Sequence, residues 1–202
     1  MEDKSPVGRV VTERRRQKIL SVVQRRQPGL TIVLEGIHDP HNVSAILRTA
    51  DAVGVLEVHL VYEIEEFPKL GKKSSGSALK WVKRRSFRSI QECYDHLRRD
   101  GFRVYATRLG ASAKSIYDLD LTGNVALVFG NEHRGVSEQA AELADGNVQI
   151  PMQGMIQSLN VSVACAVSLY EAFRQRQKAG CYAVPSLNLQ AQQQLVDEWL
   201  NK

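Results

Sequence analysis

Short apolar runs alternate with helical patterns along most of the chain, and this alternation constrains the fold more than any other feature. The apolar runs predict five strands, at 31–35, 57–62, 102–106, 125–129 and 147–150. Amphipathic stretches between and after them predict helices at 42–53, 89–100, 137–144 and 160–177. Strands that alternate with helices form a mostly parallel sheet. We therefore expect an α/β fold with a mostly parallel central sheet and flanking helices.

Helical patterns also flank this α/β region at both ends of the chain. In 10–26, valine and isoleucine recur among cations, as in an amphipathic helix, and Pro28-Gly29 ends the pattern. A last, largely polar segment follows Pro185 and is also expected to be helical. We therefore divide the chain into a basic helical extension at 1–30, an α/β domain at 31–178 and a C-terminal tail or helix at 179–202.

The stretch from Gly146 to Tyr170 contains no charged side chain. A helix that spans a bilayer needs about 20 predominantly apolar residues, whereas this stretch contains Pro151, Gly154 and several polar side chains. It predicts a buried strand, a polar loop and a buried helix. The charged N-terminus also lacks the apolar core of a signal peptide. We therefore expect a cytoplasmic protein that does not associate with membranes.

The three cysteines, Cys93, Cys165 and Cys181, are odd in number and far apart. This spacing is neither a disulfide framework nor a set of metal ligands. The sequence therefore gives no reason to expect a metal site.

Positive charge is concentrated in two segments. The first thirty residues hold eight Lys and Arg against three Asp and Glu, which accounts for the whole net charge of +5. The segment 67–91 holds eight basic residues and no acidic one. Either cluster alone is as consistent with a solvated basic surface as with a binding site. Together they favour a protein that binds a polyanion such as nucleic acid.

Ligands of parallel α/β sheets bind beyond the carboxyl ends of the strands, so the segments that follow the strands are candidate sites. In FGNEHRGVS, Gly130 and Gly135 bracket a polar turn, and Ser137 is placed to cap a helix. Neither a dinucleotide-binding nor a P-loop glycine pattern is present. The absence of both patterns argues against a nucleotide-dependent oxidoreductase, which is one function that we considered for an α/β protein of this kind.

Two further segments contain candidate residues. Asn42 is placed to cap the helix 42–53, in which Arg48 and Asp51 are neighbours on the surface and can pair. The segment 150–160 is uncharged and contains Ser158 and Asn160, which suits a pocket for an adenosine group. Taken singly, Arg48 is better explained as a surface arginine, and the loop is at least as well explained as a buried structural loop.

Taken together and in order, three segments resemble the motifs of a known family. The patterns N-x₅-R, L-x-F-G-N-E-x-x-G and I-P-M-x-G-x-x-x-S-L-N-V-S-x-A, within 31–176, resemble the motifs of SPOUT methyltransferases of the SpoU/TrmH type. The resemblance implies S-adenosyl-L-methionine as donor, an RNA ribose 2′-hydroxyl as acceptor, no metal, a homodimer and a deep trefoil knot at about 125–178. The chain is most similar to the TrmH branch, which methylates guanosine 18 in the D-loop of tRNA; another tRNA nucleotide or ribosomal RNA stays open.

The resemblance also implies roles for individual residues. The catalytic group comprises Asn42, Arg48, Glu132, Ser158 and Asn160, and the donor-binding group comprises Thr107, Gly130, Ile150, Met152, Ser158 and Leu159. Because a guanidinium is effectively always protonated, we expect Arg48 to hold a phosphate and stabilise the developing alkoxide rather than act as a base. Glu132 is expected to fix Arg48 or to receive a proton.

A set of basic residues is expected to contact tRNA phosphates: Arg9, Arg14, Arg15, Arg16, Lys18, Arg25, Arg26, Arg84, Arg85, Arg174, Arg176 and Lys178. The competing interpretation of the N-terminal helix is structural packing on a partner subunit. A second alternative function, a non-enzymatic RNA-binding protein, would not require Asn42, Arg48, Glu132 and Asn160 together.

Overall fold

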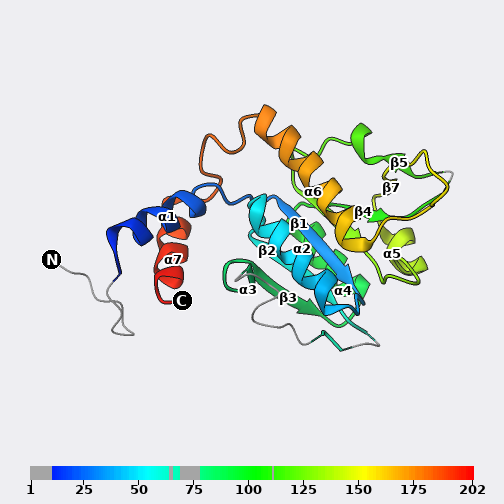
Figure 1. The fold of residues 1–202 in the computed structure, drawn as a ribbon, viewed down its shortest axis with the longest axis horizontal. Coiled ribbons are helices and arrows are strands. Elements are labelled where there is room, and N and C mark those ends of the chain that lie inside the picture. The colour runs from blue at the N-terminus through cyan, green and yellow to red at the C-terminus, as the bar shows by residue number, and fades with distance from the viewer. Residues whose placement is uncertain (1–10, 64–65, 69–77, 111) are drawn as a thin grey trace.

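The computed structural model describes residues 11–63, 66–68, 78–110 and 112–202 (Figure 1). Within them, seven parallel strands form one sheet in the order β3-β2-β1-β6-β4-β7-β5. The strands are β1 (Leu30–Glu35), β2 (Glu57–Val61), β3 (Lys83–Phe87), β4 (Arg103–Thr107), β5 (Lys114–Ser115), β6 (Val125–Phe129) and β7 (Gly146–Gln149). The predicted parallel α/β fold is therefore confirmed.

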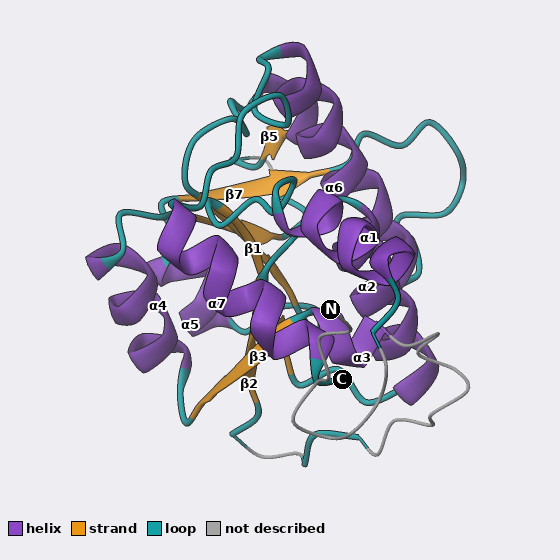
Figure 2. Ribbon diagram, turned by 90° about the vertical axis from the view of Figure 1, so that its left-hand side faces the viewer, coloured by secondary structure: helices purple, strands orange, loops and turns teal. Residues whose placement is uncertain are grey.

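Helices cover both faces of the sheet. They are α1 (Glu13–Val23), α2 (Pro40–Ala52), α3 (Ala78–Trp81), α4 (Ile90–Arg99), α5 (Glu138–Leu143), α6 (Val161–Lys178) and α7 (Leu189–Leu200), with a short 3₁₀ turn at Ile116–Asp118. Figure 2 shows α4 and α5 on one side of the strands and α2 and α6 on the other. In β1, Ile32 and Leu34 pack with α2 and α6, whereas Val33 packs with α4, because successive side chains of a strand point to opposite faces.

All five predicted strands are present, with ends shifted by about one residue, but the sequence did not predict β3, β5 or α3. The side chains of β3, KRRSF, are mostly exposed because β3 is the edge strand next to β2. An exposed edge strand carries no apolar run, so its sequence does not show the pattern used for the other strands.

The two terminal helices pack against each other. Ile19 and Val23 of α1 form a small core with Leu195, Val196 and Trp199 of α7. This pair lies at one end of the molecule, beside the sheet domain (Figure 1). Helices α1 and α7 therefore form one unit in the fold.

Two arginines of the predicted RNA-binding set are buried. Arg26 is 1% exposed, and its Nη2 lies 2.5 Å from Asp51 Oδ1. Arg176 is 3% exposed and donates to the carbonyl oxygens of Leu121 and Gly29, both at 2.9 Å. Their predicted contact with phosphate is wrong, because both guanidinium groups hold the segment between α1 and β1 against the sheet domain. Asp51 accordingly pairs with Arg26 and not with Arg48.

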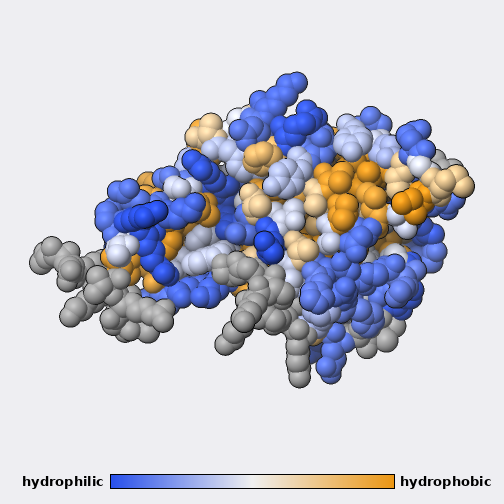
Figure 3. Space-filling model, viewed as in Figure 1, coloured by the Kyte–Doolittle hydropathy of each residue, from blue (hydrophilic) through white to orange (hydrophobic). Residues whose placement is uncertain are grey.

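The uncharged stretch 146–170 forms β7, a loop and the first half of α6. No helix of the described residues is long and apolar enough to cross a membrane. The loop and this part of α6 are more exposed than predicted: Met155 is 100%, Ile156 73%, Val163 47% and Tyr170 52% exposed. Figure 3 shows hydrophobic side chains gathered over this loop and the adjoining part of α6. The polar loop is therefore exposed in a single chain, and the predicted buried helix is buried on one face only, at residues such as Cys165 and Leu169.

A buried histidine on β2 leads to a prediction about acid stability. His59 is 4% exposed, and its Nδ1 lies 3.0 Å from Thr31 Oγ1. Burial, together with His96 and Arg85, lowers its pKa from 6.5 to about 4. Between these values the unfolded chain binds a proton that the folded chain excludes, so stability falls as pH drops from about 6.5 to 4. This group should make the protein about 2 kcal/mol less stable at pH 5 than at pH 7.

Urea unfolding of the wild type and of His59→Gln at both pH values measures this contribution. Glutamine keeps a polar group beside Thr31 but does not titrate, so the variant should lose less stability on acidification than the wild type. An equal pH dependence of the two proteins would contradict the assignment to His59.

Candidate active site

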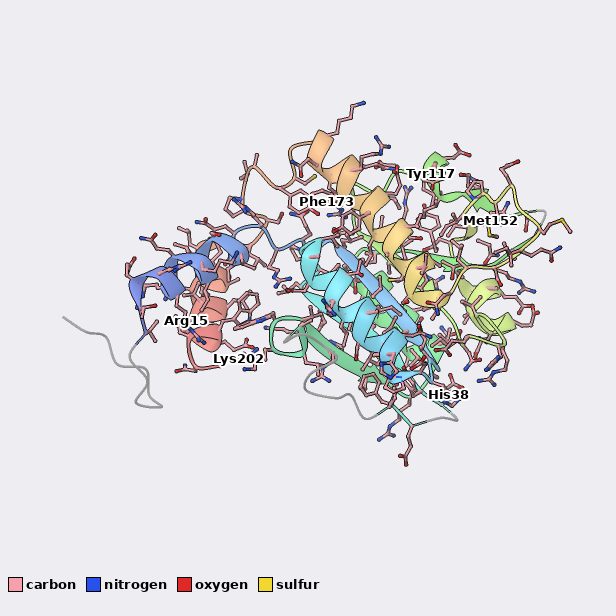
Figure 4. All side chains as sticks on the ribbon, in the orientation of Figure 1. Arg15, His38, Tyr117, Met152, Phe173 and Lys202 are labelled. Atoms are coloured by element: carbon pink, nitrogen blue, oxygen red, sulfur yellow. The ribbon has the colours of Figure 1, made fainter. Side chains whose placement is uncertain are left out.

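A cavity of about 620 Å³ lies where the carboxyl ends of β4, β6 and β7 meet. Its size is typical of small-molecule sites, which are about 300–1,000 Å³. Its walls come from 107–109, 129–136, 148–150, 152 and 157–161. In Figure 4 the labelled Met152 lies beside this end of the sheet. The cavity is thus at the place where parallel α/β sheets bind their ligands.

The structure brings all six predicted donor-binding residues to this one cavity: Thr107, Gly130, Ile150, Met152, Ser158 and Leu159. Thr107 is held in place because its Oγ1 donates to the Val128 carbonyl at 2.7 Å. Charge lies at the exposed edge, where Arg108 and Glu138 form two hydrogen bonds of 2.6 and 2.7 Å. The sequence did not single out this pair, since its members are thirty residues apart.

The turn after β6 is tight and depends on glycine. A Cβ on Gly130 would lie 2.1 Å from the carbonyl carbon of Gly135, closer than any real contact. Asn131 is buried; its Nδ2 donates to the Gly36 carbonyl at 2.7 Å, and its Oδ1 accepts from His133 N at 2.9 Å. Sequence reasoning did not assign a role to Asn131, although an asparagine inside a glycine-bracketed turn is a typical signal for such bonds.

A polar network joins the turn to α2 and α6. Glu132 Oε1 accepts from Asn42 Nδ2 at 3.0 Å, and Asn42 Oδ1 accepts from Asn160 Nδ2 at 3.1 Å. Asn160 also caps α6, because its Oδ1 accepts from Ser162 N at 2.8 Å. Asn42 therefore contacts two other predicted catalytic residues directly, Glu132 and Asn160, which are 90 and 118 positions away in the sequence.

Asn42 takes part in this network instead of capping a helix as predicted. Helix α2 begins at Pro40, and its N-cap is Asp39, whose side chain accepts from His41 N. Proline is well suited to the first helical position because it lacks the N–H that would be unsatisfied there. Two more residues are therefore helical, and the Asn42 side chain is free to bind Glu132 and Asn160.

Glu132 binds the loop before α2, not Arg48 as one prediction had it. Its carboxylate accepts from the backbone N–H groups of His38 and Asp39, both at 3.2 Å, as well as from Asn42. Burial alone would raise the pKa of Glu132, but the hydrogen bonds from Asn42 and the backbone outweigh it and lower the pKa below its ordinary value. A carboxylate stabilised in this way is a poor proton acceptor, so its geometry favours a structural role over general-base catalysis.

Arg48 is exposed on α2 and lies outside both the network and the cavity lining. Six residues after Asn42, it is about 9 Å further along the helix and turned to another face. Among the described residues, no hydrogen bond or ion pair ties its side chain down. The structure therefore leaves Arg48 accessible to a ligand from outside this chain.

Most of the remaining predicted RNA-binding residues are on the surface: Arg14, Arg15, Arg16, Lys18, Arg25, Arg84, Arg85, Arg174 and Lys178. Figure 4 labels Arg15 on α1. Arg85 and Arg174 also form ion pairs, at 3.3 Å with Glu57 and at 2.8 Å with Glu171. Arg9 lies outside the described residues. Within the described part of the chain, no group of three or more His, Cys, Asp or Glu side chains is placed to hold a metal ion.

Comparison with known sequences identifies close relatives. The SpoU rRNA Methylase family matches residues 29–170. A tRNA (guanosine(18)-2′-O)-methyltransferase of Thermus thermophilus is 51% identical over 191 residues, which are 95% of this chain and 98% of that relative. The protein of the same name from Escherichia coli is 46% identical over 165 residues, 82% of this chain and 72% of that relative.

Comparison with solved structures also finds SpoU-type enzymes. The crystal structure of a TrmH/SpoU tRNA modifying enzyme from A. aeolicus has a TM-score of 0.88 at 36% identity, and the match covers 93% of this chain and 95% of that one. The SpoU methyltransferase AviRb from Streptomyces viridochromogenes, in complex with the cofactor AdoMet, has a TM-score of 0.68 at 28% identity, over 77% of this chain and 64% of that one.

Proposed function

Because this chain belongs to the SpoU methylase family, we propose that it transfers a methyl group from S-adenosyl-L-methionine to the ribose 2′-hydroxyl of guanosine 18 in tRNA. The observation that carries the proposal is 51% identity to a tRNA (guanosine(18)-2′-O)-methyltransferase over nearly the full length of both chains. The convergence of the three sequence motifs on one cavity and one polar network supports it.

The cavity fits S-adenosyl-L-methionine in size and chemistry. Ile150, Met152 and Leu159 give it apolar walls for an adenine ring, and Gly130 lets the backbone of the turn approach closely. We expect backbone groups of this turn and of 150–152 to bind the adenosine. Bound S-adenosyl-L-methionine supplies an electrophilic methyl group, so the protein needs to hold and orient both partners.

The residues of the polar network and Arg48 have different roles in holding and orienting the donor and the acceptor. Glu132, Asn42 and Asn160 connect the loop before α2 to the turn after β6 and to the start of α6, and this turn and the start of α6 line the cavity. The guanidinium of Arg48, a positively charged group, stabilises negative charge on the phosphate beside the target ribose and on the 2′-oxygen as it attacks. The low pKa of Glu132 argues for loss of the 2′-hydroxyl proton to a group other than this carboxylate.

The test is methyl transfer from labelled donor to unmodified tRNA transcripts, followed by mapping of the labelled nucleotide. Label at guanosine 18 is expected, and a transcript with a 2′-deoxyguanosine at that position should accept none. Label elsewhere in tRNA, or transfer only to ribosomal RNA, would replace the proposed substrate by one of the two alternatives.

We also infer a homodimer, because the exposed apolar residues Met155, Ile156, Val163 and Tyr170 adjoin the candidate site. Burial of this surface against a second copy would explain why 146–170 lacks charge, since a buried charge is costly. Light scattering at micromolar concentration should give twice the mass of the chain, and Val163→Asp should shift the protein toward monomer. A wild-type monomer would contradict this.

The trefoil knot at 125–178, the division into three parts and the cytoplasmic location stay predictions.

The surface of α1 is proposed to bind tRNA phosphates. Deletion of residues 1–26 would also remove Ile19, Val23 and the buried Arg26, so substitution of exposed cations is the cleaner change. The variant Arg14→Gln, Arg15→Gln, Lys18→Gln should lower the slope of log K against log salt for tRNA by about three, roughly one for each lost contact. Filter binding across a salt series measures the slope. An unchanged slope would favour the competing role of α1 as structural packing.

A further inference from the structure

A second cavity, of about 760 Å³, lies between the α1–α7 pair and the far ends of α2 and α6. Figure 4 labels Phe173, one of its wall residues, on α6. The first cavity touches α6 at several positions from Asn160 to Ser168, and the second touches it at Phe173 and Gln177. The two cavities share no wall residue, and their nearest wall residues on α6, Ser168 and Phe173, are about 7.5 Å apart along the helix axis. The second cavity is therefore a separate site.

Aromatic rings form much of its wall: Trp81, Phe173, Tyr182 and Trp199. Phe173 and Tyr182 lie 5.2 Å apart between ring centroids, and Trp81 and Trp199 lie 5.1 Å apart. The Tyr182 hydroxyl donates to the Val53 carbonyl at 2.8 Å, which fixes that ring in place. Such surfaces favour a flat, aromatic ligand.

The charge of the wall is positive. Lys18 and Arg25 are exposed cations from α1 and the segment after it. Asp51, an acidic wall residue, is neutralised by its ion pair with Arg26. A ligand with a negative group beside its aromatic part would therefore match the cavity.

Two hydrogen-bond donors in the wall have no acceptor. Arg26 Nε and Trp199 Nε1 are buried and lack a partner in the part of the chain that the structure describes. Their residues are 1% and 2% exposed, and the guanidinium carbon of Arg26 lies 4.9 Å from the centre of the Trp199 ring. Buried donors are normally satisfied by an acceptor, because a buried donor without one is destabilising. A small adjustment of the wall around a ligand with carbonyl oxygens would satisfy them.

We propose that this cavity binds an unpaired nucleotide of the RNA substrate, at a distance from the nucleotide that is methylated. The base stacks against the aromatic wall, a carbonyl oxygen of guanine or uracil accepts from the buried donors, and Lys18 and Arg25 bind the flanking phosphates. Proteins recognise unpaired RNA bases by stacking in this way. The choice of RNA as ligand rests on the proposed function. A free nucleotide would bind through the same chemistry, and titration with an RNA and with a mononucleotide distinguishes the two ligands.

Tryptophan fluorescence reports on this cavity directly, because the only two tryptophans of the chain, Trp81 and Trp199, are both in its wall. The protein is saturated with S-adenosylhomocysteine to fill the first cavity and titrated with a single-stranded RNA hexamer or with GMP. The hexamer should quench the fluorescence saturably, at concentrations well below those needed for GMP. Equal quenching by GMP would overturn the assignment to RNA in favour of a free nucleotide.

Two variants test the contacts. Phe173→Leu should weaken hexamer binding about tenfold, as expected for loss of one stacking surface, and should raise KM for tRNA with kcat kept. Tyr117→Leu, which removes an exposed aromatic ring outside this wall, should leave quenching unchanged. Arg25→Gln should weaken hexamer binding more at low salt than at high salt, whereas Arg99→Gln on α4 should not. The proposal would be overturned if Phe173→Leu and Tyr117→Leu had equal effects on quenching, or if Arg25→Gln and Arg99→Gln had equal effects on the salt dependence of binding.

Failure of this proposal and failure of the proposed function give different results. If the wild type methylates tRNA but no RNA quenches its fluorescence, the second site is wrong and the proposed function stands. If RNA quenches the fluorescence of a protein that transfers no methyl group, the proposed function is wrong and the nucleotide site stands.

Discussion

Replacement of Arg48 by alanine should lower kcat for methyl transfer to tRNA by about 10²–10³-fold, the loss typical for removal of one preorganised group that stabilises developing negative charge. Binding of S-adenosyl-L-methionine should stay nearly intact, because Arg48 is exposed and outside the wall of the first cavity. Single-turnover methylation measures the first effect, and calorimetric titration with the donor measures the second.

The control is Arg99→Ala, which removes an exposed arginine from the opposite face of the sheet and should affect neither quantity. Arg48→Lys should recover only part of the rate, since an ammonium ion does not reproduce the planar, two-pronged contact of a guanidinium with phosphate. Near-normal turnover of Arg48→Ala would show that the catalytic assignment is wrong even for a chain of this family.

Substitution of Gly130 by alanine should have the largest effect on donor binding. The added Cβ would lie 2.1 Å from the backbone of Gly135, and backbone cannot yield as a flexible side chain can. The turn 130–136, which forms one wall of the cavity, must therefore change shape. We expect a loss of unfolding free energy of about 3 kcal/mol or more and loss of measurable binding of S-adenosyl-L-methionine. Urea unfolding and calorimetric titration give the two values.

Gly123→Ala is the matched control. No atom lies within 4 Å of the Cβ that this change would add, and the backbone at Gly123 is not left-handed. Its unfolding free energy should change by less than about 1 kcal/mol, and donor binding should be unaffected. Donor binding by Gly130→Ala with wild-type affinity would contradict the close approach seen in the turn.

The sequence singled out Asn42 as a candidate site residue but did not predict which residues it contacts. Asn42 fits a helix cap by its type and position, yet Asp39 and Pro40 are a better cap and first helical residue, and the structure uses them. The partners that Asn42 binds, Glu132 and Asn160, are 90 and 118 positions away. No local pattern carries information about contacts over such distances.

The sequence by itself determined the strands with apolar runs, the helices that cover them, and the position of the candidate site in the segments that follow the strands, whereas Thr107, Gly130 and Ile150 were identified by the family resemblance. The physical reason is that strand and helix periodicities reflect burial, and the carboxyl ends of parallel strands lie at one edge of a sheet. Only the tertiary structure decided which cations are available to a ligand. Arg26 and Arg176 have the same side chain as the exposed Arg25 and Arg174, but they meet carbonyl oxygens and a carboxylate brought there from distant segments. Burial of an arginine requires such partners, and folding alone assembles them.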